Sequence, residues 1–353
     1  MKNVTLIYLF IFTNISMACT GFGIITDTGT LTGRNRDYYY DPQQFELMQP
    51  IQQFNNWYEN NYNHNNKFYA LTSKNNVSMG VNQQGLTVIE EDSPLTKYAK
   101  KQRRLQQPEN GTAEGMIKYG ILQNFNTVDE IIPYLHKIFS VADPQFYQIA
   151  DGKKLLTVEV AYGKHNTDKT RPFTYKIYSK KNDYFAHTNH YLSPEFSSLN
   201  DLRADQDFSL STHSRLQKIT DHIVHTKVKN IRTATSWLMD THSDVASEKG
   251  HNTCMNSSLF RSDLQGMKSV SLNQGNDKIH GTVSNMVISH QGDLNHSYIY
   301  LIMLDSITTD KNNKQIIRYR TLQTTLSKLF SEPHLQFTQH TFVRQPVVNG
   351  RCN

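Results

Sequence analysis

Short runs of β-forming residues alternate with turn residues at the start of the chain. The runs 22–26 and 30–34 flank Asp27-Thr28-Gly29, and two such runs around a turn predict a β-hairpin. The same pattern predicts further strands at 67–72, 77–82 and 86–90, the last two joined by a turn at 83–85. The chain is therefore expected to enter a sheet from about Cys19 onward.

Helical patterns appear in the middle of the chain and again near residue 220. One helix is predicted at 112–123 and another from Thr127, where Glu130 completes a capping box and Pro133 is expected to introduce a kink. Later segments predict helices at 211–226 and 231–241, and strands at 145–149, 155–161, 173–179, 183–187, 268–272, 281–289 and 297–305. Two sheets with helices outside them fit this order, which predicts a mixed α/β (α+β) fold without internal repeats.

The first 18 residues predict a cleaved secretory leader. Lys2 supplies a positive start, residues 6–12 form a short apolar run, and Ser16-Met17-Ala18 suits a leader peptidase. Cleavage after Ala18 would leave 19–353 as a single domain, periplasmic or secreted, with Cys19 at its N-terminus. A lipoprotein signal also ends at a cysteine, but it prefers a leucine-like residue where this chain has Ser16. A lipid tether is therefore the less favoured alternative.

Composition narrows the class of protein. The 353 residues carry a formal charge of +6, which becomes +5 without Lys2, since 36 Lys and Arg then face 31 Asp and Glu. The excess positive charge is dispersed, so no nucleic-acid groove is expected. No apolar run, including that of the leader, reaches the length of about 20 residues that a membrane-spanning helix needs. Besides Cys19 the chain has only Cys254 and Cys352, which match no zinc spacing and leave one disulfide open. No metal site is predicted.

An N-terminal cysteine combines a nucleophile with its own base. The α-amine has an ordinary pKa of about 7.7–8.0, so a useful fraction is unprotonated near neutral pH. The second strand of the hairpin brings Arg34 and Asp37 back toward Cys19. A guanidinium favours a thiolate, and a carboxylate can orient a terminal amine. The alternative is a structural salt bridge between Arg34 and Asp37 at the end of the hairpin.

Two segments carry a resemblance to a known family. Cys19-Thr20-Gly21-Phe22 and Gly33-Arg34-Asn35-Arg36-Asp37 resemble the start of the cysteine N-terminal-nucleophile hydrolases, in particular the choloylglycine hydrolase family of bile-salt hydrolases and penicillin V acylases. The resemblance implies a four-layer αββα sandwich of two antiparallel sheets. It also implies that Cys19 is the nucleophile, that Arg34 sits beside the thiol, and that Asp37 holds the amine or the thiol.

Other segments extend the resemblance, and one departs from it. The turn 80–86 is similar to one in these families, although a plain hairpin turn accounts for Asn82 equally well. Where some bile-salt hydrolases place an asparagine in the oxyanion pocket, this chain has the acidic segment 90–93. A negative charge there would repel a developing oxyanion unless only a backbone N–H faces it. Asp92 and Asn82 are therefore weak candidates for binding substrate or oxyanion.

The segment around residue 189 resembles an acyltransferase-like branch. His187-Thr188-Asn189-His190 is closer to the acyl-coenzyme A:6-aminopenicillanic acid acyltransferase-like proteins, which implies that Asn189 donates its side-chain amide to the oxyanion. His187 and His190 lack an accompanying ligand pattern and are interpreted as structural, not metal-binding. Residues 211–216 resemble a Ser-x-x-Ser-Arg helix start in which Arg215 reaches toward the nucleophile. The alternative is a capped helix with a surface arginine.

The function expected from these features is amide hydrolysis through a thioester on Cys19, without metal or organic cofactor. The expected partner is a small-molecule N-acyl amide; penicillin V, conjugated bile acids, acyl-homoserine lactones and acylated peptides all stay open, as does a homo-oligomeric state. Acyl transfer to an amine is the second enzymatic reading. A non-catalytic binding protein on the same scaffold, secreted or tethered through Cys19, is the third.

Overall fold

Two β-sheets dominate the structure, a computed structural model that describes residues 19–39, 44–51, 64–73, 76–93, 116–161, 170–200, 206–227, 229–241, 271–272, 279–312, 315–332 and 334–344. The strands of the first sheet are β1 (Cys19–Ile25), β2 (Thr30–Tyr39), β10 (Tyr184–His187), β11 (Ser271–Leu272), β12 (Ile279–Gln291), β13 (Asp293–Thr309), β14 (Gln315–Thr325) and β15 (Thr338–Arg344). Their order is β10-β1-β2-β12-β13-β14-β15, with β11 paired to β12.

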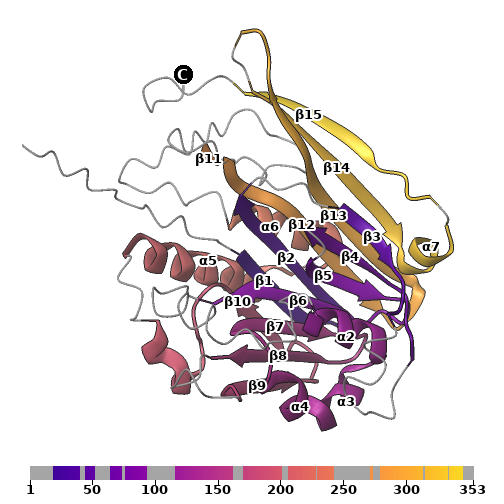
Figure 1. Ribbon diagram of the computed structural model, residues 1–353, viewed down its shortest axis with the longest axis vertical. Helices are drawn as coiled ribbons and strands as arrows, with labels where there is room; N and C mark the ends of the chain where they lie inside the picture. Colours follow the sequence, from indigo (N-terminus) through magenta and orange to yellow (C-terminus); the bar gives the residue numbers. More distant parts are fainter. Residues whose placement is uncertain are drawn as a thin grey trace, which may run out of the picture.

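The second sheet follows the chain order without a crossover. Its strands are β3 (Gln44–Met48), β4 (Phe68–Ser73), β5 (Asn76–Asn82), β6 (Thr87–Asp92), β7 (Gln145–Ala150), β8 (Leu155–Val160) and β9 (Phe173–Tyr178). Every strand pair in both sheets is antiparallel. Helices lie on the outer faces of the two sheets (Figure 1). The expected mixed α/β class and the αββα order of layers are confirmed.

Each layer boundary has its own apolar core. Between the sheets, side chains of β4, β5 and β6 pack against those of β12, β13 and β14; buried examples are Leu71, Val81, Ile89, Ile288 and Leu301. The short helix α7 (Leu326–Ser331) adds Leu326 and Leu329 to this cluster. Burial of so many aliphatic side chains, at about 25 cal/mol per Å² of apolar surface, is what holds the two sheets together.

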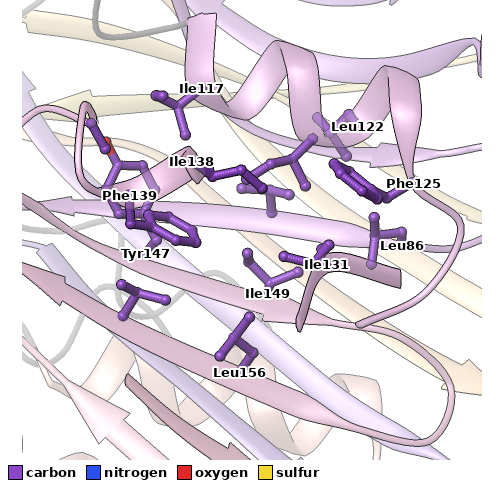
Figure 2. Close-up of a cluster of buried hydrophobic side chains, with 14 of the residues drawn as sticks. Leu86, Ile117, Leu122, Phe125, Ile131, Ile138, Phe139, Tyr147, Ile149 and Leu156 are labelled. Atoms are coloured by element: carbon purple, nitrogen blue, oxygen red, sulfur yellow. The ribbon is translucent and has the colours of Figure 1, made fainter. Parts of the chain in front are cut away.

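Helices cover the outer face of the second sheet, and one of them is divided into three consecutive parts. Helix α2 (Met116–Asn124) is followed by α3 (Val128–Ile131), the 3₁₀ turn η2 (Ile132–Tyr134) and α4 (Leu135–Phe139). Figure 2 shows their apolar side chains, among them Ile117, Leu122 and Ile131, facing Ile149 and Leu156 of the sheet. Pro133 falls in η2, where the helix is interrupted as expected.

The N-terminal cap of α3 differs in one detail from the predicted capping box. The Thr127 hydroxyl accepts a hydrogen bond from the Glu130 N–H at 3.3 Å, as a capping box requires. The Glu130 carboxylate, however, accepts from the N–H of Asn126 at 2.7 Å, one residue earlier than the motif predicts.

The first sheet is covered by α5 (Gln206–His225) and α6 (Ile231–Asp240). Phe22 and Ile24 of β1 pack against Ile219 and Trp237 of these helices. Because strand residues alternate between faces, Cys19, Gly21 and Gly23 face the second sheet. Strand β1 is buried on both faces, which explains why it lacks the apolar–polar alternation of a half-exposed strand.

Two expectations concern segments outside the described residues: the leader 1–18, and the pair Cys254 and Cys352. In the part of the chain that is described, no helix is long and apolar enough to cross a membrane. The sequence did not predict β3, β14, α7 or β15.

Candidate active site

Cys19 is the first residue of β1 and lies between the two sheets. Its side chain is 1% exposed. In the β1–β2 ladder it is opposite Arg36, and Gly21 is opposite Arg34. Residues directly opposite each other in an antiparallel pair share a face, so both arginines lie on the same face as the thiol.

Arg34 connects the thiol to the second sheet. Its Nη2 donates to Cys19 Sγ at 2.9 Å, and its Nη1 donates to the Ser78 carbonyl in β5 at 3.1 Å. Burial alone would lower the pKa of Arg34, but the charges of Cys19, Glu91 and Asp92 raise it. The guanidinium is therefore a permanent charge within hydrogen-bonding distance of sulfur.

The protonation state of the thiol differs from what Arg34 alone would predict. Burial raises the pKa of Cys19, and the charges of Asp92 and Glu91 raise it further, whereas Arg34 lowers it. Burial is the largest of these effects. The thiol is therefore the favoured form in this structure, and the expectation that the guanidinium yields a thiolate describes only one of the competing contributions.

Asn189 and Arg215 hold the other end of Cys19. The Cys19 nitrogen donates to Asn189 Oδ1 at 2.8 Å. Arg215, from α5, donates through Nη2 to the same oxygen at 3.0 Å and through Nη1 to the Cys19 carbonyl and to the Thr20 hydroxyl. Two donors converge on Oδ1, which fixes the orientation of the Asn189 amide because the opposite orientation would place three N–H groups face to face.

The amide nitrogen of Asn189 faces the second sheet. Its Nδ2 donates to the backbone carbonyl of Asp92, at the end of β6, at 2.9 Å. The backbone N–H of Asn189 donates to the Thr212 hydroxyl in α5 at 3.0 Å. Asn189 therefore joins β1, β6 and α5 at the nucleophile.

A chain of three buried ionisable groups lies beside Asn189. His187 Nδ1 is 3.0 Å from Glu91 Oε2, and its Nε2 is 2.9 Å from Glu159 Oε1. Burial would lower the pKa of His187, but the two carboxylates raise it to about 10. Burial likewise would raise the pKa of Glu159, but His187 and two backbone N–H groups lower it. His187 and Glu159 therefore form a charged pair.

His190 behaves in the opposite way. Its pKa is lowered to about 3, first by burial and then by the charges of His187, His213 and Arg215. The ring of His190 stacks on that of His213, with centroids 4.2 Å apart. Among the described residues, no group of three or more His, Cys, Asp or Glu side chains is arranged to hold a metal ion.

The predicted site residues thus separate into two sets. Cys19, Arg34, Asn189 and Arg215 are linked by direct hydrogen bonds. Asp92 adjoins them through its backbone carbonyl, and its carboxylate lies 3.5 Å from the amide nitrogen of Gln145.

Asn82 does not belong to this set, and the side chain of Asp37 lies outside the described residues. The side chain of Asn82 has a structural role. Its Nδ2 donates to the carbonyls of Leu122 and Phe125, and its Oδ1 accepts from the N–H groups of Gln84 and Leu86. The hairpin-turn alternative describes these contacts. Asp37 lies in β2, where its backbone pairs with Thr282 of β12. Its role at the amine stays a prediction.

The fold and the site define one class of protein: an αββα sandwich whose first strand begins with a buried cysteine held by two arginines and an asparagine. A family model described as acyl-coenzyme A:6-aminopenicillanic acid acyl-transferase matches residues 25–270. The chain belongs to this family. The match includes Arg34, Asn189 and Arg215 and begins after Cys19, so the position of the cysteine among them comes from the structure.

Comparison with solved structures gives matches of low sequence identity. The Caenorhabditis elegans N-acylethanolamine-hydrolyzing acid amidase ortholog is 11% identical over 76% of this chain and 92% of its own, with a TM-score of 0.43. Two variants of the conjugated bile acid hydrolase of Clostridium perfringens are each 14% identical. They cover 92% and 93% of this chain and 97% of their own, with TM-scores of 0.47 and 0.48. A comparison with curated proteins finds no significant match.

Proposed function

We propose that the mature protein is an exported cysteine amidohydrolase that cleaves a linear N-acyl amide through a thioester on Cys19. The observation that carries the proposal is that both reactive atoms of one residue are held by side chains. Arg34 contacts the sulfur at 2.9 Å, and Asn189 contacts the nitrogen at 2.8 Å. Removal of residues 1–18 would convert that nitrogen into an α-amine that already has an acceptor.

The raised pKa of the thiol favours the amine as base. As Sγ attacks the amide carbonyl, the thiol proton passes to the amine of the same residue. The resulting ammonium gives a proton to the leaving nitrogen as the C–N bond breaks, which leaves a thioester and a free amine product. Water then attacks the thioester, and its proton returns through the amine to sulfur. The second N–H of Asn189 Nδ2 is the proposed donor to the oxyanion.

Acyl transfer is the second candidate, favoured by the description of the matching family. The two reactions share the thioester and differ only in the group that attacks it. An amine in place of water would give a new amide.

The test uses the mature protein and a panel of N-acyl p-nitroanilides. Intact mass should first show a chain that begins at unmodified Cys19; an acylated terminus would contradict the mechanism. Acid-quenched samples should then contain an acyl adduct on the Cys19 peptide, and added amine acceptors distinguish transfer from hydrolysis. Cys19→Ser should lose most turnover, because an alcohol is far less acidic than a thiol. The double variant Cys254→Ser/Cys352→Ser makes the same chemical change elsewhere without leaving an unpaired thiol, and it should keep turnover. Full hydrolysis by Cys19→Ser would refute the proposal. Binding of amides by the wild type without turnover would support a non-catalytic binding protein instead.

A further inference from the structure

One carboxylate, that of Glu159, binds both ends of the loop that carries Asn189. Glu159, in β8, accepts hydrogen bonds from His187 Nε2 at 2.9 Å and from the backbone N–H groups of Leu192 at 2.7 Å and Ser193 at 3.0 Å. These donors stand on both sides of Asn189 in the sequence. A single side chain from the second sheet therefore holds both ends of the segment whose middle residue contacts the nucleophile.

His187 fixes the same loop to a second strand. Its Nδ1 is 3.0 Å from Glu91 Oε2 and 2.7 Å from its neighbour's carbonyl, that of Thr188. Glu91 precedes Asp92, whose carbonyl accepts from Asn189 Nδ2. The His187 ring thus connects β6, whose Asp92 carbonyl accepts from Asn189, to β8, which supplies Glu159.

We propose that His187 is a positioning residue of the active site, whose ring bridges Glu91 and Glu159 and so holds Asn189 in register with Cys19. The inference rests on the proposed function. It assigns to His187 a role in catalysis beyond that of a buried structural histidine, although the ring itself does not touch Cys19 or substrate.

The geometry requires both ring nitrogens to carry a proton. Each nitrogen of His187 faces acceptors only, and a neutral ring would place a lone pair against a carboxylate. The ring of Phe146, in β7, packs against that of His187, with centroids 4.2 Å apart and ring planes at 45°. The neighbouring titratable ring, His190, is neutral near pH 7, because burial and nearby charges lower its pKa. The pKa of about 10 for His187 agrees with this arrangement.

The imidazolium also balances charge near the thiol. Glu91 is fully buried, and its charge raises the pKa of Cys19. With His187 protonated, Glu91 is one half of an ion pair; with a neutral residue at 187, the buried carboxylate would lack that partner. Position 187 therefore affects both the placement of Asn189 and the field at sulfur.

The experiment combines histidine-ring NMR with kinetics. In the wild-type mature protein labelled with ¹⁵N-histidine, one imidazolium signal should persist at pH 8.5, where a histidine of ordinary pKa near 6.5 is neutral. This signal should be absent in His187→Gln. In Glu159→Gln it should titrate at lower pH, because the amide carries no negative charge to stabilise the imidazolium.

Kinetics then test the consequence. Glu159→Gln should lower kcat/KM for the best amide substrate about 10- to 100-fold, since small misplacements of a catalytic group cost about this much. Glu332→Gln is the matched control, because it makes the same change at an exposed position at the end of α7. The control should leave both the NMR titration and kcat/KM unchanged.

Each contrary result has a distinct meaning. A neutral ring at pH 8.5 in the wild type would overturn the positioning role without any variant. Unchanged kcat/KM in a folded Glu159→Gln whose imidazolium titration has moved would overturn it as well. A wild type that retains the imidazolium but hydrolyses and transfers no amide would overturn the proposed function, and the catalytic role of His187 with it.

Discussion

His190 is expected to make the stability of the protein depend on pH. The side chain is 5% exposed, and its Nδ1 lies 3.1 Å from the Thr188 hydroxyl and 2.9 Å from the Thr212 hydroxyl. One of these hydroxyls can donate to the single lone pair of a neutral ring nitrogen, whereas burial and the nearby charges of His187 and Arg215 oppose a second proton. Replacement by asparagine keeps an acceptor near the position of Nδ1 and removes the titration.

The size of the effect follows from the two pKa values. Burial and neighbouring charges lower the pKa of His190 from 6.5 to about 3 in the folded protein. Its contribution to stability is therefore present above pH 6.5 and is lost as the pH falls, because only the unfolded chain takes up the proton. Between pH 7 and pH 5 this loss amounts to about 2 kcal/mol. The result is nearly the same for any folded pKa below about 4.

Urea unfolding of the protein at pH 7 and pH 5 measures the difference. The wild type should lose about 2 kcal/mol more unfolding free energy between these pH values than His190→Asn does. Ile219→Val, which removes one buried methyl group from α5, should cost about 0.5–1.5 kcal/mol at both pH values and keep the wild-type pH dependence. Equal pH dependence in the wild type and His190→Asn would refute a buried neutral histidine.

Two further predictions concern the site. Gly21→Ala should destabilise the protein by about 1–3 kcal/mol in urea unfolding, because its Cβ would overlap the Glu91 carboxylate and the Gln148 amide; a change below about 0.5 kcal/mol would contradict this packing. In Asn189→Asp the new carboxylate should stabilise the protonated amine, so that the increase of kcat/KM with pH occurs at higher pH than in the wild type. At pH 7 kcat/KM should be at least about tenfold lower. Asn189→Ala should lose activity without that shift, and identical pH profiles for the two variants would contradict the reasoning.

The parts of the fold that the sequence predicted are those with local signals. The hairpin of β1 and β2 has short β-forming runs and a turn, and Gly29 in that turn has φ +151°, a conformation that favours glycine. Strand β14 also has an alternating pattern typical of a strand, since buried Ile317, Tyr319 and Thr321 alternate with arginines. Strand β15 carried almost none. Its described side chains are exposed or half-buried, and it is held by its ladder with β14.

Local sequence signals also predicted part of the candidate site. Cys19 and Arg34 lie close in sequence and meet through the hairpin, whereas Asn189 and Arg215 depended on a resemblance. Glu91 and Glu159 contact His187 across 96 and 28 residues, a pairing that no local pattern specifies. One signal was available: Glu159 interrupts the otherwise apolar end of β8, and a charged residue in a buried strand needs a partner.

The choice of an amide at position 189 is consistent with a cysteine that supplies its own base. Since burial favours the protonated thiol, attack requires a proton acceptor, and the α-amine can accept only while it is neutral. A carboxylate at 2.8 Å would favour the ammonium form, whereas the Asn189 oxygen accepts a hydrogen bond without adding a charge. Arg215, bonded to the same oxygen and to the Cys19 carbonyl, further disfavours a positive charge on the amine. In the proposed mechanism the two arginines would therefore act on different atoms of one residue: Arg34 would lower the cost of a thiolate during attack, and Arg215 would keep the neighbouring nitrogen able to take the proton.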